Sequence, residues 1–361
     1  MSNTIMLSSA LNSIALVGPG LSSARTLPSV SLGSPLWDLA GATPSLDLNF
    51  AQNRSLHDAV TGQQLVTFTR ASSGTFIGSN GLIQTAAENV PRFTHDPVTG
   101  KCLGLLVEGQ RTNLLLNSAT LSTQSVTVSA TAYTLSFYGT GTVTLSGTST
   151  AGPLVGTGAS TRVSLTFTPT AGSLTLTVSG SVTNANLEAG AFATSWIPTT
   201  AAAATRSADV ASITGAAFSS WYRQDEGTVF VDGAKNNLNH SASAWFLTMS
   251  TGVVSSRLQL GFDFPGTGNY AIVSAGVLQG VVNPAVNTLT RRVAAAYSSN
   301  CAVSYNGATP SSFTASSLST YSQMDIGAYV TAASGQLDGT IRRLTYWPQR
   351  LPNSTLQALT L

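Results

Sequence analysis

The sequence predicts an all-β protein, with an extended N-terminal arm followed by antiparallel β-sandwich domains of the jelly-roll kind. Three observations support this fold class. Apolar residues alternate with Ser and Thr over long stretches, which is typical of strands with one buried and one hydrated face. Turn residues, above all Gly, separate these short runs. The one short helix that the sequence suggests is confined to the closing segment "LPNSTLQALTL".

The arm comprises residues 1–45. It contains only two charged side chains, Arg25 and Asp38, and its recurring prolines favour extended backbone and break helices. An apolar segment of this length would associate with other surfaces if it were exposed to water. We therefore expect it to lie against another protein; packing on the protein's own sandwiches is the alternative. The residues expected to make this attachment are Ile5, Leu11, Leu16, Leu32 and Trp37.

Residues 46–118 are richer in charge and in turns. Their short β-type runs are separated by Thr61-Gly62, Ser73-Gly74 and Asn80-Gly81. Because Asn-Gly between apolar runs is a strong hairpin signal, this segment predicts a module of short β-hairpins.

Residues 119–205 alternate almost without break, as in "SVTVSATAYTLSFYG" and "LTLTVSG". This pattern predicts a small antiparallel β-sandwich. Residues 206–361 repeat it with more aromatic residues, for example in "GTVFVDG" and "RRVAAAYSSNCAVSYNG". This last segment is long enough for a larger two-sheet sandwich or jelly roll, closed by the short helix.

Several segments resemble virion proteins of tailed phages. Phe68–Ser118 carries "FTRAS", "NVPRF" and "LGLLVEGQRTNLLL" in that order, and it resembles a module of head-spike and tail-fibre proteins. Residues 186–210, "NLEAGAFATSWIPTTAAAATRSADV", resemble the end of a carbohydrate-binding-like sandwich that often follows it. "RRVAAAYSSNCAVSYNG" and "GTIRRLTYWPQRLPNSTLQALT" resemble the end of a laminin-G or concanavalin-like jelly roll. The resemblance covers about residues 46–361. The low charge density predicts a homo-oligomer, and the resemblance implies that it is a trimer.

A polar centre interrupts the apolar motif "GLLVEGQRTNLLLNS" at Glu108, Arg111 and Asn113. Glu108 and Arg111 can pair, Arg111 can also bind carbonyl oxygens, and Asn113 can bond backbone groups of a turn. We interpret the three as a structural junction between the hairpin module and the next sandwich. A ligand site is the alternative.

The composition argues against several functions. Charged residues make up 8% of the 361 residues, against about 25% in ordinary globular proteins, and the net charge is +2. Without a basic stripe we expect no nucleic-acid partner, and without an apolar run of about 20 residues no membrane span. So few charges indicate a surface covered by other subunits or coated with small polar residues.

The sequence also predicts no enzyme, no cofactor and no metal site. Glycoside hydrolysis needs two carboxylates facing one bond, and no acidic residue lies between Glu108 and Glu188. Cys102 and Cys301 have no metal-ligand spacing with the three histidines, so they are two buried thiols or one disulfide between domains. The resembled jelly rolls can hold calcium, but no cluster of oxygen ligands identifies such a site here.

A ligand site is expected in the last domain, although most of its aromatic residues should be core. The loop "FDFPGTGNY" joins an acid, a Gly-Asn turn and an aromatic ring. The predicted ligand-binding residues are Asp263, Asn269, Tyr270 and Trp245.

The resulting expectation is a non-enzymatic virion protein, assembled in the host cytoplasm and placed on the virion surface. It would be a tail or capsid fibre or spike that is anchored to other virion proteins by residues 1–45 and binds host-surface glycan. The alternative is a purely structural spike, cement or adaptor protein without a ligand.

Overall fold

The computed structural model describes residues 35–236, 244–262, 270–283, 288–330 and 335–361. The chain divides into two compact units, residues 1–43 and residues 44–361. The described part of the first unit contains one helix, α1 (Pro35–Ala40). The prediction of extended backbone is therefore wrong for this end of the arm, where Leu, Trp and Ala are all compatible with a helix. The other predicted attachment residues, Ile5, Leu11, Leu16 and Leu32, lie outside the described residues.

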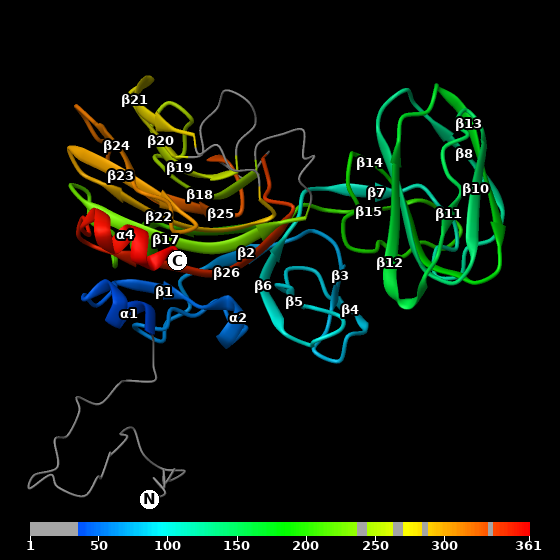
Figure 1. The fold of residues 1–361 in the computed structure, drawn as a ribbon, viewed down its shortest axis with the longest axis horizontal. Helices are drawn as coiled ribbons and strands as arrows, with labels where there is room; N and C mark the ends of the chain where they lie inside the picture. The colour runs from blue at the N-terminus through cyan, green and yellow to red at the C-terminus, as the bar shows by residue number, and fades with distance from the viewer. Residues whose placement is uncertain (1–34, 237–243, 263–269, 284–287, 331–334) are drawn as a thin grey trace, which may run out of the picture. The chain divides into compact units, whose positions relative to one another are not determined.

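The second unit confirms the all-β prediction. Its larger sheet has eight antiparallel strands, and the chain's last strand, β26, pairs with three others: β17, β6 and β1 (Figure 1). In spatial order the sheet contains β24 (Ser311–Thr314), β23 (Asn300–Tyr305), β22 (Thr290–Tyr297), β17 (Gly227–Lys235), β26 (Gly339–Trp347), β6 (Cys102–Val107) and β5 (Phe93–His95), with β1 (Leu46–Leu48) also beside β26.

A seven-stranded antiparallel sheet packs against the first. Its order is β2 (Thr67–Thr69), β16 (Val210–Thr214), β25 (Gln323–Ile326), β18 (Ala244–Ser250), β19 (Arg257–Phe262), β20 (Tyr270–Ser274) and β21 (Val277–Val282). Apolar side chains of both sheets share one core, in which Leu46, Phe246 and Leu344 are fully buried. This arrangement is the predicted two-sheet sandwich.

The domain boundaries differ from the prediction. β1, β2, β5 and β6, all from residues 46–107, lie in the same two sheets as the strands from residues 210–347, and both segments fill the same core. The predicted separate domains 46–118 and 206–361 are therefore one domain, called here the principal domain. Three-residue strands such as β1 and β5 bury little surface by themselves, so they are stable only as parts of the larger sheet.

A smaller sandwich is inserted into the principal domain and has its own core, with Leu135, Phe137 and Leu174 fully buried. We call residues 114–203 the inserted sandwich. One sheet contains β11 (Leu154–Val155), β10 (Thr142–Gly147), β13 (Gly172–Ser179) and β8 (Gln124–Val128), and the other β12 (Gly158–Phe167), β9 (Tyr133–Gly139) and β14 (Val182–Ala189). The alternating pattern of residues 119–205 thus predicted a sandwich correctly.

Two short paired strands form the neck of the insertion. β7 (Arg111–Asn113) leads into the inserted sandwich and pairs with β15 (Ala204–Arg206), which leads out of it. Since both ends of the insertion lie side by side, the chain leaves and re-enters the principal domain at one place.

The remaining elements are small. β3 (Gly74–Ile77) and β4 (Ile83–Ala86) form the hairpin predicted around Asn80-Gly81, with Gly81 at a φ of +75°. The predicted C-terminal helix is α4 (Asn353–Leu359), and two further helices are α2 (Phe50–Asn53) and α3 (Gly215–Ser219). α4 lies against β22 and β23.

Gly104, the two cysteines and the helices bear on earlier expectations from the sequence. Gly104 of "LGLLVEG" has a φ of +104°, and an added Cβ would collide with the Ile341 carbonyl oxygen on β26, so only Gly fits there. Both thiols are free; Cys301 is buried and Cys102 half-buried. No helix within the described ranges is long and apolar enough to cross a membrane.

Candidate functional site

Five charged side chains, none more than 1% exposed, meet at ends of strands near the neck. We call them the buried charge network: Arg70, Arg92, Glu108, Arg206 and Asp209. Each follows or precedes a strand of the principal domain or belongs to β15. The network therefore joins the hairpin module, the neck and the larger sandwich.

Arg92 is the centre of the network. Its guanidinium bonds the Asp209 carboxylate with one nitrogen, and its Nη1 lies 2.8 Å from Glu108 Oε2. Arg70 Nη1 bonds the other Asp209 oxygen at 3.1 Å. Because buried charges are costly unless paired, this arrangement of paired ions has to form as a unit.

Glu108 accepts bonds on both carboxylate oxygens. Ser195 donates its backbone N–H at 2.7 Å and its hydroxyl at 2.6 Å, and Arg206 Nη1 lies 3.1 Å away. Burial by itself would raise the pKa of Glu108, but the charges of Arg206 and Arg92 and the bonds from Ser195 outweigh it and lower the pKa to about 2. Glu108 is therefore a fixed negative charge.

Asn113 is fully buried and uses its whole amide. Its Nδ2 donates to the carbonyls of Ala185 and Ile197, both at 2.8 Å, and its Oδ1 accepts from the N–H groups of Leu115 and Leu187. The amide thus holds the first residues of the inserted sandwich to its last strand. Asn113 therefore holds β7 of the neck to the inserted sandwich, and its bonds do not extend to the hairpin module.

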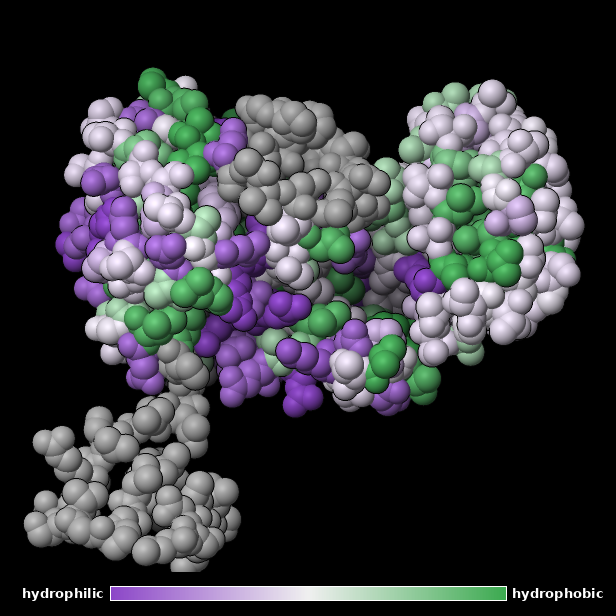
Figure 2. Space-filling view, in the orientation of Figure 1, coloured by the Kyte–Doolittle hydropathy of each residue, from purple (hydrophilic) through white to green (hydrophobic). Residues whose placement is uncertain are grey.

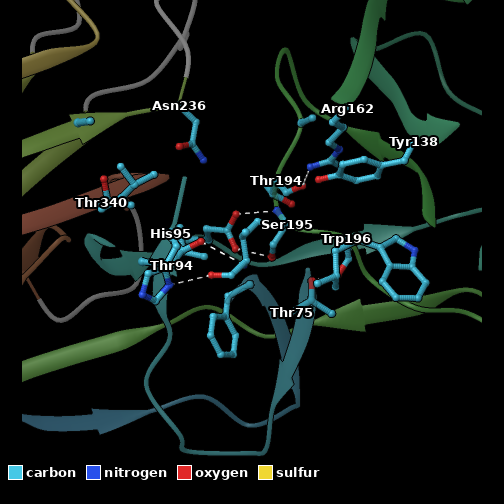
Figure 3. Close-up of a pocket in the computed structure, with 18 of the residues that line it drawn as sticks. Thr75, Thr94, His95, Tyr138, Arg162, Thr194, Ser195, Trp196, Asn236 and Thr340 are labelled. Carbon is cyan, nitrogen blue, oxygen red and sulfur yellow. Dashed lines mark hydrogen bonds between the residues drawn. The ribbon is translucent and has the colours of Figure 1, made fainter. Parts of the chain in front are cut away.

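A pocket of about 370 Å³ lies beside the buried charge network, with Glu108 and Ser195 in its wall. The inserted sandwich contributes Tyr138 on β9 and Arg162 on β12, which Figure 3 shows together on one wall. The principal domain contributes His95 on β5 and Asn236 after β17. Trp196 and Arg342 also line it.

Side chains that line the pocket have nitrogens without a hydrogen-bond partner, as do Arg92 and Arg206 in the buried charge network. Three buried nitrogens in its lining, His95 Nε2, Arg162 Nε and Arg342 Nε, have no hydrogen-bond partner. Buried polar groups are nearly always bonded in proteins, so an exception needs an explanation such as a ligand or water. Size, an aromatic ring and converging polar groups are typical of a small-molecule site.

Comparisons with known proteins give no family for this chain. No protein-family model matches, and no curated protein matches. Among solved structures, the CBM40 of Ruminococcus gnavus IT-sialidase aligns with 38% of this chain and 84% of its own, at 12% identity and a TM-score of 0.32. Domain 4 of AbnA, a GH43 extracellular arabinanase from Geobacillus stearothermophilus solved with arabinotriose, aligns with 43% and 73%, at 13% identity and a TM-score of 0.33. A binding domain of botulinum neurotoxin serotype D/C aligns with 42% and 40%, at 10% identity and a TM-score of 0.31.

The structure corrects the predicted pairing at the junction. Glu108 pairs with Arg92, which precedes β5, and with Arg206 on β15, instead of Arg111. The Arg111 side chain is 21% exposed and lies 3.9 Å from both Glu188 and Asp338. A smaller pocket of about 250 Å³ adjoins Arg111, so the alternative of a ligand site remains open for this residue.

Of the four residues predicted to bind a ligand in the last domain, the structure describes only Tyr270 and Trp245. Asp263 and Asn269 lie outside the described residues. Tyr270 is fully buried, with its hydroxyl bonded to the Ala296 carbonyl at 3.0 Å, and Trp245 is 4% exposed beside Tyr329. Neither ring presents a face to solvent, so both are core residues and the prediction of a ligand contact is wrong for them. They belong to the large apolar filling that two facing sheets need.

Apart from Glu108, the residues that line the pocket were not predicted from the sequence, although one signal points to them. Arg162 is the only charged residue between Arg111 and Glu188. Figure 2 agrees with this count: the inserted sandwich is mostly white to green, and purple residues gather on the principal domain. A single charged side chain such as Arg162 in an otherwise uncharged stretch of sequence is unusual, and this isolation is the signal that marks the pocket. Elsewhere, no group of three or more His, Cys, Asp or Glu within the described ranges could hold a metal ion.

Proposed function

We propose that this chain is a non-enzymatic structural protein of a tailed-phage virion that holds host-surface glycan in the pocket between His95 and Arg162. The observation that carries the proposal is the pocket itself, whose lining combines aromatic rings with buried nitrogens that have no partner. Sugars are bound by this combination, because their ring faces stack on aromatic side chains and their hydroxyls take directed hydrogen bonds.

The state of Glu108 supports a role in binding over catalysis. It is the only carboxylate among the described lining residues, and both its oxygens are occupied. With a pKa of about 2 it cannot act as a general acid near neutral pH. Glycoside hydrolysis in its usual form also needs a second carboxylate across the bond.

The virion assignment rests on the resemblance of residues 46–361 and on the apolar N-terminal arm. In this proposal the arm contacts other virion proteins, the sandwiches project outward, and the protein is a homotrimer. The low proportion of charged residues supports extensive subunit contact.

One observation favours the alternative of a structural protein without a ligand. Four charged residues of the resembled motifs, Arg70, Arg92, Glu108 and Arg206, belong to the buried charge network. Architecture alone therefore explains this part of the motifs.

A glycan array probed with the full-length chain separates the two proposals. We expect retention of at least one glycan class, and loss of it in Tyr138→Ala with an unchanged melting temperature. Lys101→Ala is the control, since Lys101 is exposed and does not line the pocket. Full-length protein that retains no glycan would leave the purely structural role.

A further inference from the structure

We propose that the pocket selects an anionic saccharide, whose acidic group lies against Arg162 and Arg342 while a hydroxyl donates to His95. This inference rests on the proposed function and names the ligand class for the same site. It depends on three features of the pocket: its charges, the tautomer of His95 and its size.

The first feature is the charge of the pocket, which begins with Arg162, an arginine without a counter-ion. Arg162 Nη2 donates to the Ser136 hydroxyl at 2.7 Å and its Nη1 to the Thr194 carbonyl, so neutral groups fix the guanidinium in place. No ion pair of Arg162 occurs among the described residues, and its Nε is buried without a partner. A guanidinium held rigidly by neutral groups is ready to bind a planar acid.

The second cation of the pocket is only partly compensated. Arg342 Nη1 lies 3.3 Å from Asp232, but Arg292 lies 3.6 Å from the same carboxylate. Two arginines therefore share one acid, and Arg342 Nε has no partner.

The acid in the pocket wall does not neutralise these arginines. Glu108 is paired with Arg92 and Arg206, and the whole buried charge network holds three arginines and two carboxylates. Glu188, which accepts from Thr194 in the pocket wall, lies 3.9 Å from Arg111 and so offsets that arginine. Within the described ranges Arg162 therefore still has no carboxylate of its own, and a neutral sugar would leave its charge without a counter-ion.

The second feature is His95, whose Nε2 can accept a hydrogen bond. His95 is 6% exposed, and its Nδ1 lies 3.1 Å from the Ile77 carbonyl. A carbonyl can only accept, so Nδ1 carries the hydrogen and Nε2 of the neutral ring holds a lone pair. A lone pair near two cationic donors suits a molecule with both a hydroxyl and an acidic group, and this combination is the chemistry of an acidic sugar.

The third feature is the size of the pocket, which limits how much of a glycan can enter. Small-molecule sites commonly measure about 300–1,000 Å³, and this one is near the lower end at about 370 Å³. It therefore suits one terminal or branching acidic unit, with the rest of the chain outside. A carboxylated sugar and a phosphorylated sugar share this chemistry.

Titration calorimetry with three matched probes tests the inference on the full-length chain. The probes are a disaccharide that contains a uronic acid, the same disaccharide with the carboxyl reduced to an alcohol, and its phosphate ester. We expect at least one charged form to bind about tenfold or more tightly than the reduced form, with an affinity that falls as salt rises. Whichever charged form binds more tightly identifies the source of the acidic group.

Variants locate the effect in the pocket. Arg162→Gln should remove the preference for the charged probe, Arg162→Lys should restore part of it, and Arg342→Gln should weaken it independently. Lys101→Gln, which removes an exposed positive charge outside the pocket, should leave it unchanged, and melting temperatures exclude misfolding. Equal binding of charged and reduced probes would overturn the anionic inference and leave glycan binding intact. No binding of any probe, together with an empty glycan array, would overturn both.

Discussion

Arg92 and Asp209, 117 positions apart in the chain, form an ion pair in which neither side chain has any exposed surface. Arg92 precedes β5 in one sheet, and Asp209 precedes β16 in the other. The pair therefore fixes the hairpin module to the chain at the point where it leaves the inserted sandwich. Its partners Glu108, Arg70 and Arg206 extend the same contact across the neck.

Glu108→Gln should destabilise the protein by about 3–5 kcal/mol, since it leaves Arg206 without its carboxylate and makes Arg92 and Arg70 share Asp209 as their one acid in the network. Equilibrium unfolding in guanidinium chloride measures the change. Asp225→Asn is the matched control: it removes the exposed pair with Arg223, for which about 0–1 kcal/mol is expected. Equal losses in the two variants would contradict the importance assigned to burial.

The stability of the protein should fall in acid because of Glu108. Its pKa is about 2 in the folded chain, below the ordinary value of 4.5. A lowered carboxyl pKa stabilises the folded state fully above the unfolded value, and this contribution is lost as the pH falls from about 4.5 to about 2. The difference corresponds to about 3 kcal/mol. Unfolding curves over this range should be steeper in pH for the native chain than for Glu108→Gln; parallel curves would assign the acid sensitivity to other groups.

Asn113→Ala should cost about 3 kcal/mol or more, because it leaves two buried carbonyls and two buried N–H groups without their side-chain partner. Arg111→Ala should cost only about 1 kcal/mol, since its ion pairs are long and its side chain is partly exposed. Differential scanning calorimetry of the two variants gives the comparison. An Arg111 variant as unstable as the Asn113 variant would make Arg111 the stronger junction residue.

Removal of residues 1–43 should leave the melting temperature of the rest unchanged, because the second compact unit begins at Pro44. Removal of residues 1–48 should unfold it: this deletion takes away β1 and Asp47, whose carboxylate accepts from Arg343 at 2.6 Å and 2.8 Å and from Thr345 at 2.9 Å. Circular dichroism separates the two deletions. In the proposed virion role, the shorter deletion also abolishes incorporation into particles, and a folded 44–361 fragment that still incorporates would remove the arm as an anchor.

Local patterns in the sequence predicted the local structure. Alternation predicted the strands of the inserted sandwich, Asn80-Gly81 predicted the β3–β4 hairpin, and the final Leu-rich segment predicted α4. These signals succeed because each depends on neighbours in sequence: side-chain period, turn geometry and helix capping.

Pairing between distant segments was not predictable in this way. Nothing local in Leu46–Leu48 indicates that it pairs with β26 near the other end of the chain. Likewise Glu108 has an arginine three residues away, yet it pairs with Arg206 beyond the inserted sandwich. The pocket depends on the same distant contacts, since His95 and Arg162 come from different domains; only the isolation of Arg162 in sequence pointed to it.

The position of β26 determines the order in which the protein can fold during synthesis. Residues 44–113 emerge from the ribosome before the rest of the principal domain, but β1 and β6 pair with a strand that emerges only at residues 339–347. The inserted sandwich, whose strands pair with one another, can fold well before that. The nascent chain therefore carries a folded small domain between two unfolded segments of the principal domain. The edges of β6 and β17 stay open to other chains until residues 339–347 have emerged.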